Sequence, residues 1–206
     1  MRQQVLAWLA ENVPDARVKH VLRVEQVAIE LAQQHKLNIE HAAQAGLMHD
    51  LAKYFKPKTI LQTVRAEGLL LDPADETNPH LLHAEASAIV ARDRFRVRDE
   101  EVLQAISNHT LGRPNMSLLS CILFLADALE PGRGKTPELD ALREKSCQDV
   151  YQAVWLTCDY KLKHLLKTQR FIHPRAIQTR NWFLNAVKER RKTIHNAELI
   201  QDSIPA

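Results

Sequence analysis

The sequence predicts an all-α protein, and three observations support this fold class. Glycine is scarce, with 5 residues among 206, and aromatic residues make up only 5% of the chain. Alanine, leucine, glutamine and charged residues, most of which favour helices, are abundant instead. Apolar residues recur at spacings of three and four, and we find no convincing strand pattern and no internal repeat. With 45% hydrophobic residues, we expect one domain over residues 1–190 and a polar, frayed tail over 191–206.

The first two helices follow from their caps and their apolar positions. Residues 2–11 are amphipathic, and the helix is expected to stop near Pro14. Asp15 is placed to cap the next helix, over 16–35. The apolar stripe of that helix consists of Val18, Val21, Leu22, Val24, Val27, Ala28 and Leu31.

The following segment is predicted to contain two more helices and a loop. Asn38 caps a third helix that runs to His49, and a fourth helix follows Pro57. The stretch 70–79 is polar and holds two prolines, so we expect a loop there. Asn78 would cap the helix after it.

Six helices are predicted after residue 79. Pro131-Gly132-Arg133-Gly134 interrupts the helical pattern sharply. The predicted ranges are 80–94, 98–109, 116–130, 137–146, 148–167 and 174–190. The aromatic residues of the last two helices and their connection are expected to cover the core, a homodimer surface being the alternative; they are Trp155, Tyr160, Phe171, Trp182 and Phe183.

Composition excludes several classes of protein. The formal charge of +3 is too small to argue for nucleic acid as a partner. The longest apolar run, around 118–129, is too short to cross a bilayer and contains Asp127. The N-terminus lacks signal-peptide features, and Cys121, Cys147 and Cys158 lack metal-type spacing. We therefore expect a cytoplasmic protein with reduced thiols and no membrane association.

The most informative pair of residues is His49-Asp50. An imidazole next to a carboxylate suits a divalent metal, and the two carboxylate oxygens can bridge two ions. Lys53, one turn later, adds a positive charge where an anionic substrate would lie, although it also suits a helix C-terminus.

Other potential ligands lie on predicted core-facing stripes. Burying an unpaired carboxylate is costly, so Asp127, within the most apolar helix, must be paired or metal-bound. The remaining candidates are His20, His83 and His109.

Each candidate has a structural alternative when it is taken alone. A single histidine on an apolar face is usually a hydrogen-bonded core residue. Asp127 could pair with Arg133, and His80 competes with His83 for the same ligand position. The joint pattern is more specific than any single member; it comprises His20, His49, Asp50, His83, His109 and Asp127.

This pattern resembles the HD-domain metal-dependent phosphohydrolases, in the variant with two extra histidines. Residues from about 16 to about 160 are similar to the bacterial YqeK family, and the segments that carry the similarity are Arg17–His20, Gly46–Lys53, Leu81–His83, Ala105–Gly112 and Phe124–Arg133. The resemblance implies symmetrical hydrolysis of diadenosine tetraphosphate to two ADP at a di-iron centre.

The chemistry of the residues is compatible with this implication. Two divalent ions lower the pKa of a shared water from about 15.7 towards 7 and bind the attacked phosphate. Imidazole-rich ligation suits iron, manganese, cobalt or zinc better than magnesium, and iron is our first expectation. A hydroxide would lie between the two ions, which Asp50 would also bridge, with His20, His49 and Asp127 serving mainly one ion and His83 and His109 the other.

Contacts with the dinucleoside polyphosphate substrate are also expected. Lys53 and Arg133 would hold phosphate oxygens, and Thr110 and Gly112 would line the mouth of the site. No side chain stands out as a general acid, and His80 is the one nearby candidate.

Two other functions stay open at this stage. The first is phosphohydrolysis of another nucleotide, a cyclic dinucleotide or another phosphoester, because one metal core can serve several substrates. The second is a non-catalytic module that binds a nucleotide and regulates a partner. The complete ligand set argues against that module, while the pocket for a second nucleoside is not visible in the sequence.

Overall fold

The fold is built from helices alone across the residues that the structure describes. The computed structural model describes the backbone of residues 1–201 and the side chains of residues 1–193. Its α-helices are α1 (Arg2–Asn12), α2 (Asp15–Gln34), α3 (Ile39–Met48), α4 (Pro57–Ala66), α5 (Pro73–Thr77), α6 (His83–Phe95), α7 (Glu100–Asn108), α8 (Leu118–Leu129), α9 (Pro137–Gln148), α10 (Val150–Lys167) and α11 (Pro174–Gln201). Two short 3-10 helices are η1 (Pro79–Leu82) and η2 (Pro131–Arg133). The predicted all-α class is confirmed.

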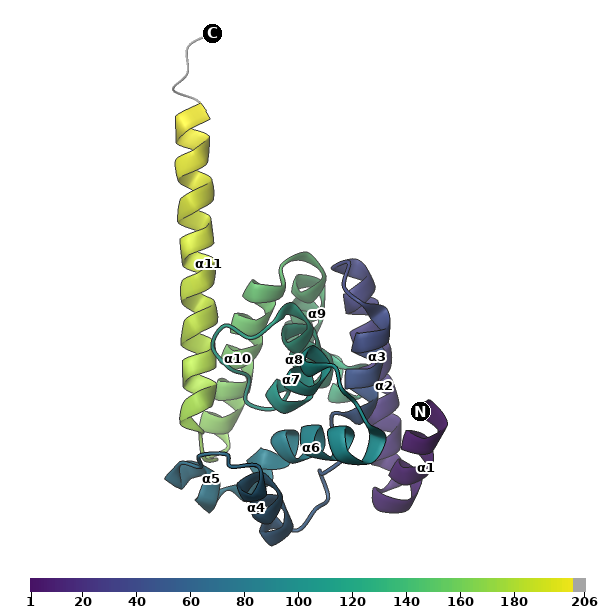
Figure 1. Ribbon diagram of the computed structural model, residues 1–206. Helices are drawn as coiled ribbons and strands as arrows, with labels where there is room; N and C mark the ends of the chain where they lie inside the picture. The colour runs from purple at the N-terminus through teal and green to yellow at the C-terminus, as the bar shows by residue number, and fades with distance from the viewer. Residues whose placement is uncertain (202–206) are drawn as a thin grey trace.

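The centre of the molecule is the junction of α2, α3, α7 and α8. Helix α8 is buried along most of its length and packs against α2, α7 and α10. Phe124 and Ile106 lie in the main apolar core, both at most 1% exposed. Figure 1 shows α10 and α11 as a hairpin beside this core, with α11 extending far past the other helices. In the described part of the chain, no helix combines the length and hydropathy needed to span a membrane.

Helices α2 and α3 approach closely because Gly46 has no side chain. A Cβ atom at Gly46 would lie 2.7 Å from the Cα atom of Glu25 in α2. This spacing is shorter than van der Waals contact, so any larger residue would push the two helices apart. The close contact brings His20 of α2 near His49, the residue after α3.

The aromatic residues near the C-terminus mostly cover the core, as predicted. Phe183 is fully buried, and Trp155, Tyr160 and Trp182 are partly buried against the core. Phe171 is the exception, because it is about half exposed in the connection between α10 and α11.

Three local predictions differ from the structure. The expected loop at 70–79 contains α5, because the Asp72 side chain accepts hydrogen bonds from the first turn and Asp75 reciprocates as a capping box. Asn78 does not cap the next helix through its side chain. Helix α11 continues past 190 to Gln201, and the last part of the predicted tail, 202–206, lies outside the described residues.

Candidate metal centre

Four histidines surround one aspartate at the junction of the central helices. His20 comes from α2, His49 and Asp50 follow the end of α3, and His83 begins α6. His109 follows the end of α7. All five side chains are buried, with at most 5% of each residue exposed. The interior of α2 and the ends of α3, α6 and α7 therefore converge on Asp50.

Each carboxylate oxygen of Asp50 faces its own pair of imidazoles. The Oδ2 atom lies 3.4 Å from His49 Nε2 and 3.8 Å from His20 Nε2. The Oδ1 atom lies 3.2 Å from His83 Nε2 and 3.6 Å from His109 Nε2. Two groups of three potential ligands therefore share Asp50, which is the geometry that a bridging carboxylate requires.

All four imidazoles are oriented by hydrogen bonds from Nδ1. His49 donates to the carbonyl of Gly46, His83 to that of His80 and His109 to that of Ile106, each at 2.7 Å; His20 donates to Glu130 Oε1 at 3.0 Å. Carbonyl and carboxylate oxygens can only accept, so Nδ1 carries the proton in each ring. The lone pair of every Nε2 then faces the centre, as in metal-binding histidines.

The protonation states also suit metal ions. Burial alone would raise the pKa of Asp50, but the surrounding histidines, His49 foremost, hold this pKa well below its ordinary range. Burial lowers the pKa of His109 to about 4. An ionised Asp50 carboxylate and a neutral His109 imidazole are therefore present at neutral pH, whereas the neighbouring Asp50 carboxylate, against the effect of burial, raises the pKa of His49. Imidazole and carboxylate donors together fit divalent transition metals.

Two carboxylates flank the His20 side of the cluster. Asp127 Oδ1 lies 3.2 Å from His20 Nε2, and Asp127 is also paired with Arg133. Glu130, whose role the sequence did not reveal, accepts from both His20 and Arg23. Burial would raise the pKa of Glu130, but these hydrogen bonds lower it to about 2. The one sequence feature that sets Glu130 apart is its place at the helix break before Pro131, where η2 packs against α2.

Lys53 and Thr110, two of the predicted substrate contacts, lie beside the His83 and His109 pair. Lys53 Nζ is 3.1 Å from His83 Nε2. Thr110 Oγ1 is 3.0 Å from His109 Nε2 and 3.1 Å from His83 Nε2. Arg133 instead contacts Asp127, which is the structural alternative that the sequence left open.

Two of the other candidate residues, Gly112 and His80, lie outside the ligand set. Gly112 is buried, and a Cβ atom there would lie 2.5 Å from Thr179 Cγ2. Its φ of +67° explains the glycine, so the residue permits a tight turn against α11 rather than lining a mouth. His80 does not replace His83 as a ligand candidate, because η1 turns its imidazole outward and only its carbonyl serves the cluster.

Two cations at the cluster were not assigned a role from the sequence. Arg17 Nη1 lies 2.8 Å from Asp50 Oδ2. Lys161 of α10 donates to the carbonyl of Thr110 at 3.0 Å, across 51 positions of sequence. Such long-range contacts leave no periodic signal in the sequence.

A third group of potential ligands, near α5, is already satisfied. His173 Nε2 donates to Asp75 Oδ1 at 3.0 Å, while its Nδ1 accepts from the backbone N–H of Arg175. Asp72, the third member, caps α5. This group therefore ties α5 to the start of α11.

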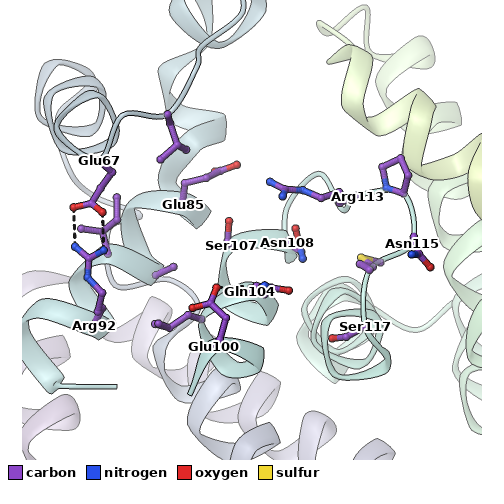
Figure 2. Close-up of a pocket in the computed structure, with 16 residues that line it drawn as sticks. Glu67, Glu85, Arg92, Glu100, Gln104, Ser107, Asn108, Arg113, Asn115 and Ser117 are labelled. Carbon is purple, nitrogen blue, oxygen red and sulfur yellow. Dashed lines mark hydrogen bonds and ion pairs between the residues drawn. The ribbon is translucent and has the colours of Figure 1, made fainter. Parts of the chain in front are cut away.

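A separate cavity of about 400 Å³ is lined in part by α6 and α7. Figure 2 shows its lining residues. Asn108 lines it, whereas the next residue, His109, faces the cluster. Arg92 and Glu67 form a bidentate ion pair in its lining, with Nη1–Oε2 and Nη2–Oε1 distances of 2.6 and 2.7 Å. Its lining holds three glutamates and two arginines, so it repels a polyanion more than it attracts one.

Comparison with known proteins places the cluster in a family. The HD domain matches residues 17–132, which include every predicted ligand. The symmetrical bis(5'-nucleosyl)-tetraphosphatase of Bacillus subtilis is 32% identical over 184 residues, covering 89% of this chain and 98% of the relative. The enzyme of the same name from Halalkalibacterium halodurans is 34% identical, covering 89% and 97%.

A solved structure shows the same fold. It is a hydrolase of the HD superfamily from Clostridium acetobutylicum, with a TM-score of 0.86 and 35% sequence identity. The match covers 90% of this chain and 98% of that one. The chain therefore belongs to the HD-domain family, in the YqeK branch that contains the symmetrical bis(5'-nucleosyl)-tetraphosphatases.

Proposed function

We propose that this protein hydrolyses diadenosine tetraphosphate to two molecules of ADP at a binuclear metal centre. The observation that carries the proposal is Asp50, whose two oxygens face separate pairs of metal-competent imidazoles. The relatives that align with almost the whole chain are symmetrical bis(5'-nucleosyl)-tetraphosphatases, which supports the substrate. The proposed ligands are His20, His49, Asp50, His83, His109 and Asp127.

The residues divide the work of the reaction. When bound, two divalent ions supply a nucleophilic hydroxide at neutral pH and neutralise charge on the phosphoryl oxygens. Asp50 holds the two halves of the cluster at a fixed spacing. Lys53 and Thr110 lie where the phosphate chain would enter beside His83, and they orient it by charge and by hydrogen bonding. Arg133 exchanges its contact with Asp127 for a phosphate oxygen.

We propose iron as the resident metal, with manganese, cobalt and zinc as the alternatives. Imidazole nitrogens outnumber carboxylates around Asp50, and this balance disfavours magnesium, which prefers oxygen ligands. A cytoplasmic location fits the three cysteines, all free, because reducing compartments keep thiols unpaired.

Product analysis tests the proposal directly. The protein is loaded with iron or manganese, diadenosine tetraphosphate is added, and the nucleotides are separated by chromatography. We expect ADP alone, two molecules for each substrate. His49→Gln should abolish both metal retention and turnover, because His49 is buried beside Asp50. His41→Gln is the matched control, since His41 lies on α3 outside the cluster and should leave both unchanged.

Other outcomes would redirect the assignment. ATP plus AMP, or turnover of a different nucleotide or phosphoester alone, would contradict the symmetrical reaction and favour another phosphohydrolase. Nucleotide binding without metal-dependent turnover would favour a regulatory module.

A further inference from the structure

Three adjoining cavities run along α10 beside the metal cluster. The Tyr160 pocket, of about 350 Å³, is lined by residues that include Asp127, Arg133, Tyr160 and His164. The Phe171 pocket, of about 340 Å³, is lined by residues that include His80, Arg170 and Phe171. A smaller apolar cavity of about 180 Å³ connects them, because it shares Lys161 with the first, Leu81 with the second and Leu165 with both.

The two larger pockets adjoin different ends of the cluster. Asp127 lines the Tyr160 pocket and lies 3.2 Å from His20 Nε2. His80 lines the Phe171 pocket, and its carbonyl accepts the Nδ1 hydrogen bond of His83. The connecting cavity is lined by Thr110, which contacts His83 and His109. A ligand with two arms could therefore place its centre at the metals and one arm in each pocket.

Both pockets carry the same set of chemical groups. Each has one aromatic ring, an arginine and at least one histidine in its wall, and the two volumes are almost equal. Aromatic rings stack on nucleobases, and guanidinium groups bind phosphate. Volumes above about 300 Å³ are typical of small-ligand pockets.

Lys161 supplies a cation between the two pockets. Its Nζ donates to the carbonyl of Thr110 and lies 4.3 Å from the centre of the Phe124 ring, so its position is fixed. An ammonium group has three N–H donors, which leaves others for a ligand. The cavity in Figure 2, by contrast, has more acidic than basic side chains and is lined by none of the cluster residues.

We propose that the Tyr160 and Phe171 pockets each bind one nucleoside of a dinucleoside polyphosphate, and that Lys161 contacts the phosphate chain between them. This inference rests on the proposed function. It adds the two pockets as the feature that selects substrates with a nucleoside at each end. The walls that matter most come from α10 and the segment after it, outside the 17–132 match to the HD domain.

The test measures binding separately from turnover. Calorimetry on the metal-loaded protein uses two probes: diadenosine tetraphosphate with a methylene group between its central phosphates, and β,γ-methylene ATP as a one-armed ligand. Tyr160→Leu and Phe171→Leu remove stacking while keeping an apolar side chain. Leu166→Ala, at an exposed position of α10 that lines none of the three cavities, is the matched control.

We expect each aromatic variant to weaken binding of the two-armed probe by about fivefold or more, which is the lower range for loss of one stacked base. The one-armed probe should change by less than about twofold in either variant, because the other pocket still accepts its nucleoside. Leu166→Ala should change neither value.

Equal affinity of the unmodified protein for both probes would overturn the inference. So would an unchanged affinity for the two-armed probe in either aromatic variant. Turnover of diadenosine tetraphosphate is measured in parallel; if it is absent while two-armed binding behaves as expected, the proposed function fails and the two-pocket inference stands.

Discussion

The two halves of the cluster differ in what holds their histidines. In the Oδ2 half, formed by His20 and His49, a carboxylate from Glu130 orients His20 and Asp127 lies close to it. In the Oδ1 half, formed by His83 and His109, both rings are oriented by backbone carbonyls alone. The side chains next to that half are the Lys53 ammonium and the Thr110 hydroxyl.

This difference suggests that one half mainly holds a metal ion and that the other half mainly receives the substrate. Carboxylates that accept from a ligand imidazole raise its basicity and strengthen metal binding. The Oδ2 half is therefore built to retain an ion. The cations of the Oδ2 half, Arg17 and Arg133, are each paired with a carboxylate. Lys53, beside the Oδ1 half, forms no ion pair with a carboxylate among the described side chains, so it favours an incoming anion together with the Thr110 hydroxyl. We expect the phosphate chain to approach from the Oδ1 half.

The largest effect should come from removing the residue that the halves share. Asp50→Ala takes away one ligand oxygen from each half, so both ions should be lost. Turnover should fall by much more than about 100-fold, the upper value for changes to residues that only hydrogen-bond to a ligand. Elemental analysis and product assays measure this, with circular dichroism to confirm that the helices remain. Retention of one ion would show that the halves bind independently, and unchanged turnover would refute the metal assignment.

A smaller effect should distinguish the halves. Glu130→Gln removes the charge that His20 and Arg23 share, so the affinity of the Oδ2 half for metal should fall by about 10–100-fold. Titration with a competing chelator should then release one ion per chain before the other. Glu67→Gln, which alters a surface pair with Arg92, is the control. Equal weakening of both ions would contradict the comparison.

The sequence predicts the buried histidines better than the residues that contact them. His20, His49 and His109 lie on apolar helical stripes, so their burial could be inferred from periodicity. The helices themselves were predictable for the same reason. Glu130 and Lys161 act on residues 110 and 51 positions away, and no local pattern encodes such contacts. The close packing of Gly112 could not be predicted, because its neighbour Thr179 lies in a helix whose packing the sequence does not display.

The spacing of α2 and α3 gives a prediction about stability. Gly46→Ala would place a Cβ atom 2.7 Å from Glu25 Cα, and overpacking of this kind costs about 1–3 kcal/mol in the free energy of unfolding. Urea denaturation measures the loss, which should be accompanied by weaker metal binding in the Oδ2 half. Gly68→Asn is the control, because a Cβ atom there meets nothing and asparagine tolerates the φ of +73°. An unchanged midpoint in Gly46→Ala would show that the helices separate without cost.

The smallest effect should fall on the Oδ1 half alone. Lys53 lies 3.1 Å from His83 Nε2, and burial lowers the pKa of its ammonium group. If this group binds phosphate rather than supporting the metals, Lys53→Ala should raise KM by about tenfold, as expected for one lost charged hydrogen bond, with both ions retained. Lys58→Ala, an exposed change on α4, should alter neither quantity. Loss of an ion in Lys53→Ala would mean that the lysine supports the Oδ1 half structurally, and the direction of substrate entry would then have to be assigned from Thr110 instead.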